Sequence, residues 1–142
     1  MLWRISNYAD LSGTGGLLFP GRWHAKGRPI VYLAESPAGA LVEMLVHMDR
    51  DDLPDGFQLL GVDTGDLTPA AISGLPENWR DLTAAPKVLG LNWLQKGESA
   101  LLRVPSAILP HTWNVLLNPA HADSAKARIV SRERVPLDSR LG

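Results

Sequence analysis

The sequence contains no cysteine, which excludes one large group of functional sites. Without thiols the chain forms no disulfide, thiolate-bound zinc site or iron–sulfur cluster, and it has no cysteine nucleophile. An excess of basic residues is also missing, because 14 lysines and arginines stand against 15 acidic residues, for a formal net charge of −1. Such a chain lacks the positive field that draws in nucleic acid, so we expect no direct nucleic-acid binding.

Long hydrophobic runs are absent as well. No apolar segment approaches the roughly 20 residues that a membrane-spanning helix needs, and the first ten residues, MLWRISNYAD, have no cationic start followed by an apolar stretch. We therefore expect a soluble cytoplasmic protein without membrane contact. With 142 residues, of which 45% are hydrophobic, the chain can bury one core, and we expect a single domain over residues 1–142.

The 13 glycines and 11 prolines divide the chain into short elements. Ser36 followed by Pro37 predicts the start of a helix, because serine caps helices and proline suits their first turn. The other expected elements are a strand at 1–5, a glycine-rich loop at 12–16, a buried strand at 29–34, a strand at 57–62, a helix at 87–95, and closing strands at 99–104, 112–117 and 127–135. Strands and helices do not alternate regularly, which favours an α+β fold over a doubly wound sheet.

The densest chemical signal lies in the first third of the chain. Residues 21–24, Gly-Arg-Trp-His, precede Tyr32 in a predicted strand and Glu43 in the following helix. On that helix, Glu43 shares a face with Ala40 and His47. A loop, a strand and a helix at this spacing could converge on one cleft. Spacing alone is a weak argument, because such residues are more often a surface charge, a core aromatic and a solvent-facing carboxylate.

The order and spacing of short motifs along nearly the whole chain resemble the RES domain, the toxin half of a bacterial type II toxin–antitoxin pair. The matching motifs are Trp3-Arg4, a glycine loop, Gly21-Arg22-Trp23, Gly27, residues 30–36 (IVYLAES), Leu41-Val42-Glu43, Val104-Pro105-Ser106, residues 114–119 (NVLLNP), His121 and residues 136–141 (PLDSRL). The resemblance implies a single α+β domain related to ADP-ribosyltransferases of the diphtheria-toxin type, with mixed or antiparallel strands and few helices.

The same resemblance implies an enzyme that cleaves the nicotinamide–ribose bond of NAD⁺ by hydrolysis or phosphorolysis, and so depletes NAD⁺ and arrests growth. Transfer of ADP-ribose to a protein is the alternative activity in the family. NAD⁺ would be the substrate, and no cofactor is implied. The expected partner is an antitoxin with an Xre-like helix-turn-helix domain, and we expect a toxin dimer within the larger complex.

Three residues suit that chemistry as catalytic residues. Positive charge develops on the ribose as the bond breaks, so the Glu43 carboxylate can stabilise the transition state; it could instead orient the attacking water or phosphate. Arg22 has the bidentate fork that grips a pyrophosphate or ribose oxygen, although it could equally form a salt bridge that pins the glycine loop. Tyr32 offers an aromatic face to the cationic nicotinamide ring, or it is an ordinary buried tyrosine.

Further candidate substrate-binding residues flank these three. Arg4 is a second candidate for the pyrophosphate, and Gly21 either admits a ligand close to the backbone or makes a turn. Trp23 is a structural or a binding residue, and Ser36 caps its helix and could also reach the substrate. His24 stands where members of the family commonly have asparagine; a ligand contact, a proton donor and a tolerated replacement all remain open.

Two other features carry less weight. Glu43 and His47 lie four residues apart, but one such pair is too few ligands for a catalytic metal, so we expect no metal site. Ser106, in Val-Pro-Ser, is expected to be structural. A different class of function also stays open, namely a non-enzymatic module whose exposed tryptophans dock another protein.

Overall fold

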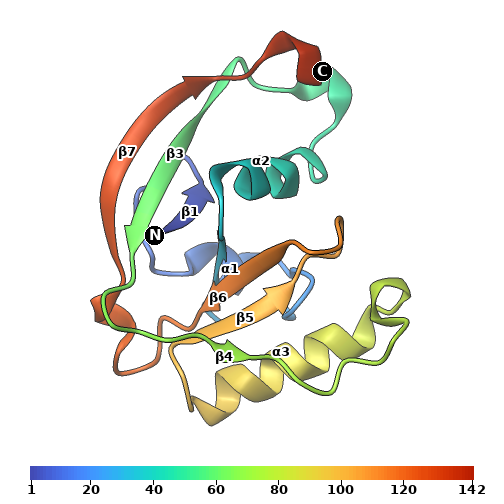
Figure 1. Cartoon of the computed structure of the whole chain (residues 1–142), viewed down its shortest axis with the longest axis vertical. Helices are drawn as coiled ribbons and strands as arrows, with labels where there is room; N and C mark the ends of the chain where they lie inside the picture. Colours follow the sequence, from blue (N-terminus) through green and yellow to red (C-terminus); the bar gives the residue numbers. More distant parts are fainter.

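A curved seven-stranded sheet organises the computed structural model, which describes residues 1–142 (Figure 1). The strands are β1 (Leu2–Ile5), β2 (Val31–Ala34), β3 (Gly56–Asp63), β4 (Ala70–Ala71), β5 (Leu101–Pro105), β6 (Trp113–Leu117) and β7 (Arg128–Pro136). They are ordered β4-β5-β6-β2-β1-β3-β7. Only β4 and β5 run parallel, and every other neighbouring pair is antiparallel. This mixed sheet with few helices confirms the predicted α+β fold.

Three α-helices accompany the sheet: α1 (Thr14–Leu18), α2 (Pro37–Leu45) and α3 (Ala84–Lys96). Short 3₁₀ turns occur at Arg50–Asp52, Trp79–Asp81, Ser124–Lys126 and Ser139–Leu141. The start of α2 was predicted correctly, since the Ser36 hydroxyl accepts a hydrogen bond from the Gly39 N–H at 3.0 Å. α3 ends at Gly97, whose φ of 61° is a left-handed conformation that glycine adopts without strain. No helix is both long enough and apolar enough to cross a bilayer.

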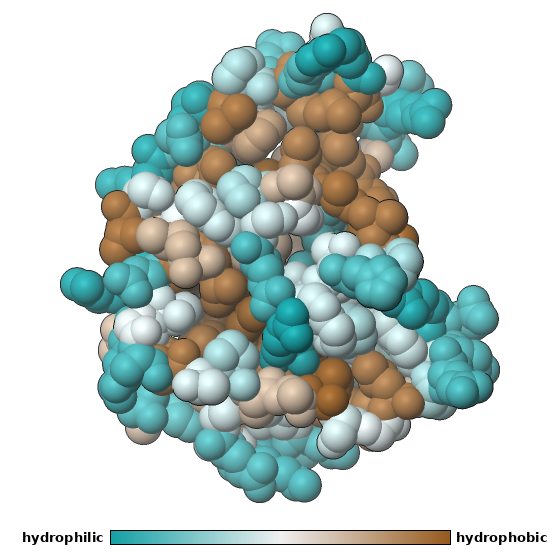
Figure 2. All heavy atoms as spheres, viewed as in Figure 1, coloured by the Kyte–Doolittle hydropathy of each residue, from teal (hydrophilic) through white to brown (hydrophobic).

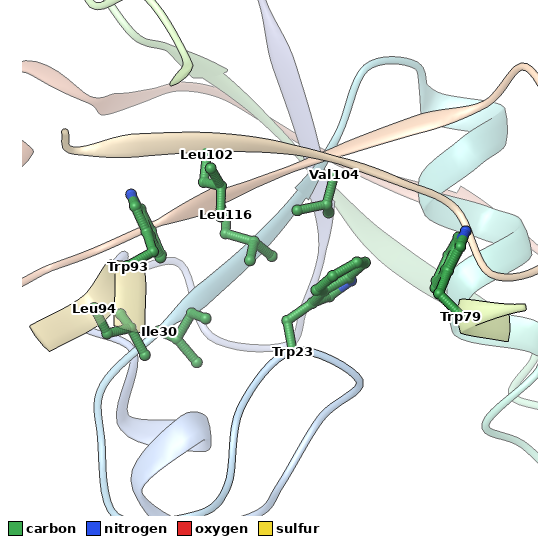
Figure 3. Close-up of a cluster of buried hydrophobic side chains, with 8 residues drawn as sticks. All are labelled: Trp23, Ile30, Trp79, Trp93, Leu94, Leu102, Val104 and Leu116. Atoms are coloured by element: carbon green, nitrogen blue, oxygen red, sulfur yellow. The ribbon is translucent and has the colours of Figure 1, made fainter. Parts of the chain in front are cut away.

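Side-chain alternation along the strands divides the core between the two faces of the sheet. One cluster contains Trp23, Ile30, Trp79, Trp93, Leu94, Leu102, Val104 and Leu116, and it joins α3 to β5 and β6 (Figure 3). The other contains Val31, Leu33, Val62, Leu101, Val115, Leu117 and Ala127. Tyr32 is paired with Leu116, and Asn114 with Val104, so both polar residues belong to the tryptophan-rich face. α2 packs against β1 and β2 beside them (Figure 1).

The glycine-rich segment at 12–16 differs from the prediction, because the short helix α1 begins within it at Thr14 and continues to Leu18. Gly13 precedes the helix with a φ of 74°. A Cβ at Gly16 would lie 2.6 Å from Cγ2 of Ile30, closer than side chains pack. The glycines that argue against a long helix therefore allow a short helix to lie directly against the strand that follows.

Candidate active site

A cavity of about 630 Å³ lies between α2, the first two strands and the loop at 19–24. Figure 2 shows the surface hollowed beside the hydrophobic side chains that gather over α2. The cavity walls include Arg22, Tyr32 and Glu43, so the structure brings together the three side chains that the sequence singled out. Ala40 and His47 line the cavity with Glu43, as the predicted helix face requires.

The Glu43 carboxylate is held by two neutral donors. The Ser106 hydroxyl donates to Oε1 at 3.1 Å, and the Asn114 side-chain amide donates to the same oxygen at 2.9 Å. No cation pairs with Glu43 in any of the ion pairs of the structure. Glu43 is also the only acidic residue that lines the cavity. Its negative charge is therefore available to a cationic ligand rather than neutralised by the protein.

A chain of hydrogen bonds orients the Tyr32 hydroxyl. This oxygen accepts from the Trp23 N–H at 3.2 Å and lies 2.7 Å from Nδ1 of His24. His24 Nε2 faces the carbonyl oxygens of Phe19 at 3.0 Å and Gly16 at 3.2 Å. Carbonyl oxygens only accept, so Nε2 carries the hydrogen and Nδ1 of the neutral ring accepts from Tyr32.

The protonation states of Tyr32 and His24 agree with donation from the Tyr32 hydroxyl to Nδ1 of His24. Burial raises the pKa of the Tyr32 phenol well above its usual value, so the group stays protonated. Burial also lowers the pKa of His24, so its ring is neutral near pH 7. His24 is 2% exposed and both of its ring nitrogens are engaged. The geometry therefore favours a structural role for His24, in which it ties the glycine segment to Tyr32.

We expect the free energy of unfolding to depend on pH through His24. Its pKa is lower in the folded than in the unfolded state, where it is about 6.5. As the pH falls, the unfolded state therefore takes up the proton first. This contribution to stability is fully present above about pH 6.5 and is lost progressively below it.

Urea unfolding across this pH range, for the wild type and His24→Asn, measures the effect. Asparagine keeps a hydrogen-bonding side chain but does not titrate, so the variant should lose less stability on acidification. Equal losses in the two proteins would contradict the role of His24 in this pH dependence.

The loop side of the cavity is cationic. Arg22 Nη1 donates to the carbonyl oxygens of Leu82 at 3.3 Å and Arg80 at 3.4 Å, and the guanidinium lies 6.0 Å from the centre of the Trp79 ring. It takes part in no ion pair, so the salt bridge that was the alternative for Arg22 is not formed. The Lys87 ammonium donates to the Gly21 carbonyl. Burial, and then the nearby Arg22 charge, lower the pKa of Lys87.

Gly21 and Trp23 contribute through close packing. A Cβ at Gly21 would overlap the Tyr32 hydroxyl, so the residue must be glycine for that hydroxyl to reach the loop. Trp23 borders the cavity but is 3% exposed, and its ring lies 5.4 Å from the Trp79 ring. Both residues therefore hold the loop in place while contributing to the cavity wall.

Arg4 and Ser36 each make a contact that accounts for their position without a substrate. Arg4 borders the cavity, but it follows Trp3 along β1, so its side chain points to the opposite face of the sheet. Its guanidinium donates to the carbonyl of Asp10 and ties down the segment before the glycines. Ser36 does not line the cavity, and its hydroxyl caps α2.

Sequence reasoning did not identify the two donors to Glu43. Ser106 was predicted to be structural, and Asn114 was noted only as the first residue of a motif. The available signal was the motifs themselves, because Ser106 directly follows β5 and Asn114 lies in β6, its antiparallel neighbour. The structure brings no group of three histidine or acidic side chains together as a metal site would require.

Known proteins match this chain along nearly its whole length. The family model described as the RES domain matches residues 1–138. The chain is 46% identical over 144 residues to "Toxin Res" of Pseudomonas putida, an alignment that covers 99% of each chain. It is 39% identical over 146 residues to the "Prs ADP-ribosylating toxin" of a Sphingobium species, covering 92% of this chain and 90% of the other.

A solved structure shows the same fold. The crystal structure of the M. tuberculosis MbcT–MbcA toxin–antitoxin complex contains a chain that matches with a TM-score of 0.72. The match covers 95% of this chain and 83% of that chain at 15% sequence identity.

Proposed function

Because this chain belongs to the RES domain family, we propose that it is the toxin of a toxin–antitoxin pair and that it cleaves the nicotinamide–ribose bond of NAD⁺. The observation that carries the proposal is the charge arrangement of the cavity. One carboxylate without a cationic partner, Glu43, shares the cavity with Arg22, a cation without an anionic partner. NAD⁺ has the matching pair of charges, a cationic nicotinamide ring and an anionic diphosphate.

The size and lining of the cavity support the same ligand. Its volume of about 630 Å³ is within the range of small-molecule sites. Arg22 lines the cavity and would bind the diphosphate through charge-assisted hydrogen bonds. Lys87 does not line the cavity, and its nearby positive charge adds to the attraction. Tyr32 would place its ring against nicotinamide while its hydroxyl stays fixed by Trp23 and His24.

In this proposal Glu43 stabilises the charge that develops as the bond breaks. The electron pair of the C–N bond moves to the nicotinamide nitrogen, and positive charge passes to C1′ and the ring oxygen of the ribose. The Glu43 carboxylate interacts more strongly with that cation than with the ground state, which lowers the barrier. Water then adds to C1′ and releases a proton, or phosphate adds in its place; the carboxylate could also orient either nucleophile.

The acceptor decides between hydrolysis, phosphorolysis and transfer. Purified protein should be incubated with NAD⁺ labelled in the adenylate half, with and without phosphate, and with and without cell lysate. We expect stoichiometric release of nicotinamide with all of the label in small molecules. Label in protein would favour ADP-ribosyl transfer, the activity that the name of the Sphingobium relative describes. No release of nicotinamide under any condition would contradict the proposal.

The non-enzymatic alternative required exposed tryptophans. Trp23, Trp79 and Trp93 are buried in the core instead, and the other two tryptophans are partly buried (Figure 3). The tryptophans therefore give this alternative no support.

We also propose that a partner antitoxin covers the cavity. Phe19 and Val46 line it and are 69% and 51% exposed, so the cavity presents apolar side chains that a partner could bury. The similar fold in the MbcT–MbcA complex supports a partner of this kind. The family resemblance implies an Xre-like helix-turn-helix antitoxin and a toxin dimer in the complex, and we propose both for this chain. A cytoplasmic location is likewise a proposal. Co-purification with the partner should abolish nicotinamide release.

A further inference from the structure

Asn114 contains a buried acceptor that has no donor in the protein. The residue lies in β6, lines the cavity and is 8% exposed. A carboxylate oxygen only accepts hydrogen bonds, so the contact with Glu43 Oε1 places the amide nitrogen toward Glu43 and the amide oxygen away from it. That oxygen, Oδ1, is buried without a hydrogen-bond partner.

This arrangement lowers stability relative to an apolar side chain of similar shape. A buried carbonyl oxygen loses its hydrogen bonds to water on folding, and here the protein does not replace them. The strand neighbours of Asn114 are Ala34 and Val104, which have no polar side-chain group. The one hydrogen bond that the Asn114 side chain makes is its donation to Glu43. The contact with Glu43 is therefore what explains an amide side chain at position 114.

Ser106 strengthens this argument, because it directs a second donor to the same atom. Its side chain is 1% exposed, and its oxygen accepts from the Ile108 N–H at 3.1 Å. That contact turns the single hydroxyl hydrogen toward Glu43 Oε1, at 3.1 Å. The two donors come from β6 and from the residue after β5, so both are fixed by the sheet.

We infer that Asn114 is a positioning residue that, together with Ser106, holds Oε1 of Glu43 and leaves Oε2 for the ligand. Two donors on one oxygen prevent the carboxylate from rotating about its terminal bond. The carboxylate is then ordered before the substrate binds, so less ordering remains to be done in the transition state. The inference rests on the proposed function, in which the Glu43 carboxylate acts on the ribosyl cation.

The test is Asn114→Leu, assayed for nicotinamide release and for thermal unfolding. Leucine keeps the branched shape, removes the unpaired oxygen and removes the donor to Glu43. We expect kcat to fall by about 10- to 100-fold, KM for NAD⁺ to change by less than about twofold, and Tm to stay level or rise. Asn114→Asp, which also lacks the donor and places a second carboxylate beside Glu43, should lose at least as much kcat.

Asn118→Leu is the matched control. Asn118 is also buried, at 3% exposed, but its amide is satisfied on both sides, donating to the Leu94 carbonyl at 3.3 Å and accepting from the Ala120 N–H at 3.1 Å. This control should lose Tm while retaining kcat at a temperature where it is folded. A merely structural role for Asn114 would make both variants behave in this way, and that result would overturn the inference.

Glu43→Gln and the double variant with Asn114→Leu separate this inference from the proposed function. If Asn114 acts through Glu43, the leucine should cause little further loss once Glu43 is replaced. A kcat for Asn114→Leu within about twofold of the wild type, with Glu43→Gln inactive, would overturn the positioning role and leave the proposed function standing. Full activity of Glu43→Gln would overturn the role of Glu43 itself.

Discussion

Glu43→Gln is expected to lower the rate of nicotinamide release by at least about 100-fold without unfolding the protein. The glutamine oxygen can still accept from Ser106 and Asn114, so the hydrogen bonds around residue 43 are kept. What disappears is the negative charge, in a cavity where no other acidic residue lines the wall to replace it. Steady-state kinetics, with Tm recorded for each protein, measure the effect.

Glu35→Gln is the matched control for this experiment. Glu35 pairs with Arg103 at 2.8 Å on the surface and does not line the cavity. Loss of an exposed ion pair of this kind costs about 1 kcal/mol at most, so both activity and fold should be retained. In a cell without the partner, the wild type and Glu35→Gln should arrest growth and lower NAD⁺, whereas Glu43→Gln should do neither. A folded Glu43→Gln protein within tenfold of wild-type activity would contradict the assignment.

Gly90→Ala is expected to damage both the fold and the site. Gly90 lies in α3, and a Cβ there would penetrate the backbone carbonyl of Trp23. The obstacle is backbone rather than a flexible side chain, so α3 or the loop at 21–24 must move. We expect a cost of about 3 kcal/mol, which in a domain of this size lowers Tm by roughly 10 °C.

The movement should also reach the proposed catalytic residues. The Trp23 N–H donates to the Tyr32 hydroxyl, so displacement of this backbone disturbs the hydrogen bonds that orient Tyr32. Nicotinamide release should therefore fall even at temperatures where the variant is folded. Thermal unfolding and kinetics at low temperature measure the two effects separately.

Asn92→Ala is the control, because Asn92 is on the exposed side of the same helix. Asn92→Ala also introduces alanine into α3, but at a position that does not contact the loop at 21–24. This variant should keep or raise Tm. An unchanged Tm for Gly90→Ala would show that the contact between α3 and Trp23 is not tight in solution.

The secondary-structure elements that were predicted correctly depend on residues close together in the sequence. The helix start at Ser36 and Pro37, and the helix stop at Gly97, were correct because capping depends on neighbouring residues. The β-branched run at 29–34 contains β2, which begins at Val31, for a similar reason. The glycine segment at 12–16 was harder to predict, because its short helix depends on contact with Ile30 rather than on helix propensity.

The candidate site was only partly predictable. Arg22, Tyr32 and Glu43 were singled out by the match to the RES-domain motifs, since their spacing alone was a weak argument, and the structure places them in one cavity. The sequence did not reveal that His24 accepts from Tyr32, because two backbone carbonyls decide which ring nitrogen carries the hydrogen. Likewise Arg4 follows Trp3 directly in a motif, yet strand alternation turns its side chain to the other face.

The sequence by itself determined most of the short elements and the α+β class, which follow from local propensity. It pointed to the three polar residues of the first third only through their match to the RES-domain motifs. Only the tertiary structure decided that Ser106 and Asn114 hold Glu43. These contacts join residues 63 and 71 positions apart along the chain. They exist because the antiparallel register of β5, β6 and β2 turns one set of side chains toward α2, and such a register depends on pairing between distant segments.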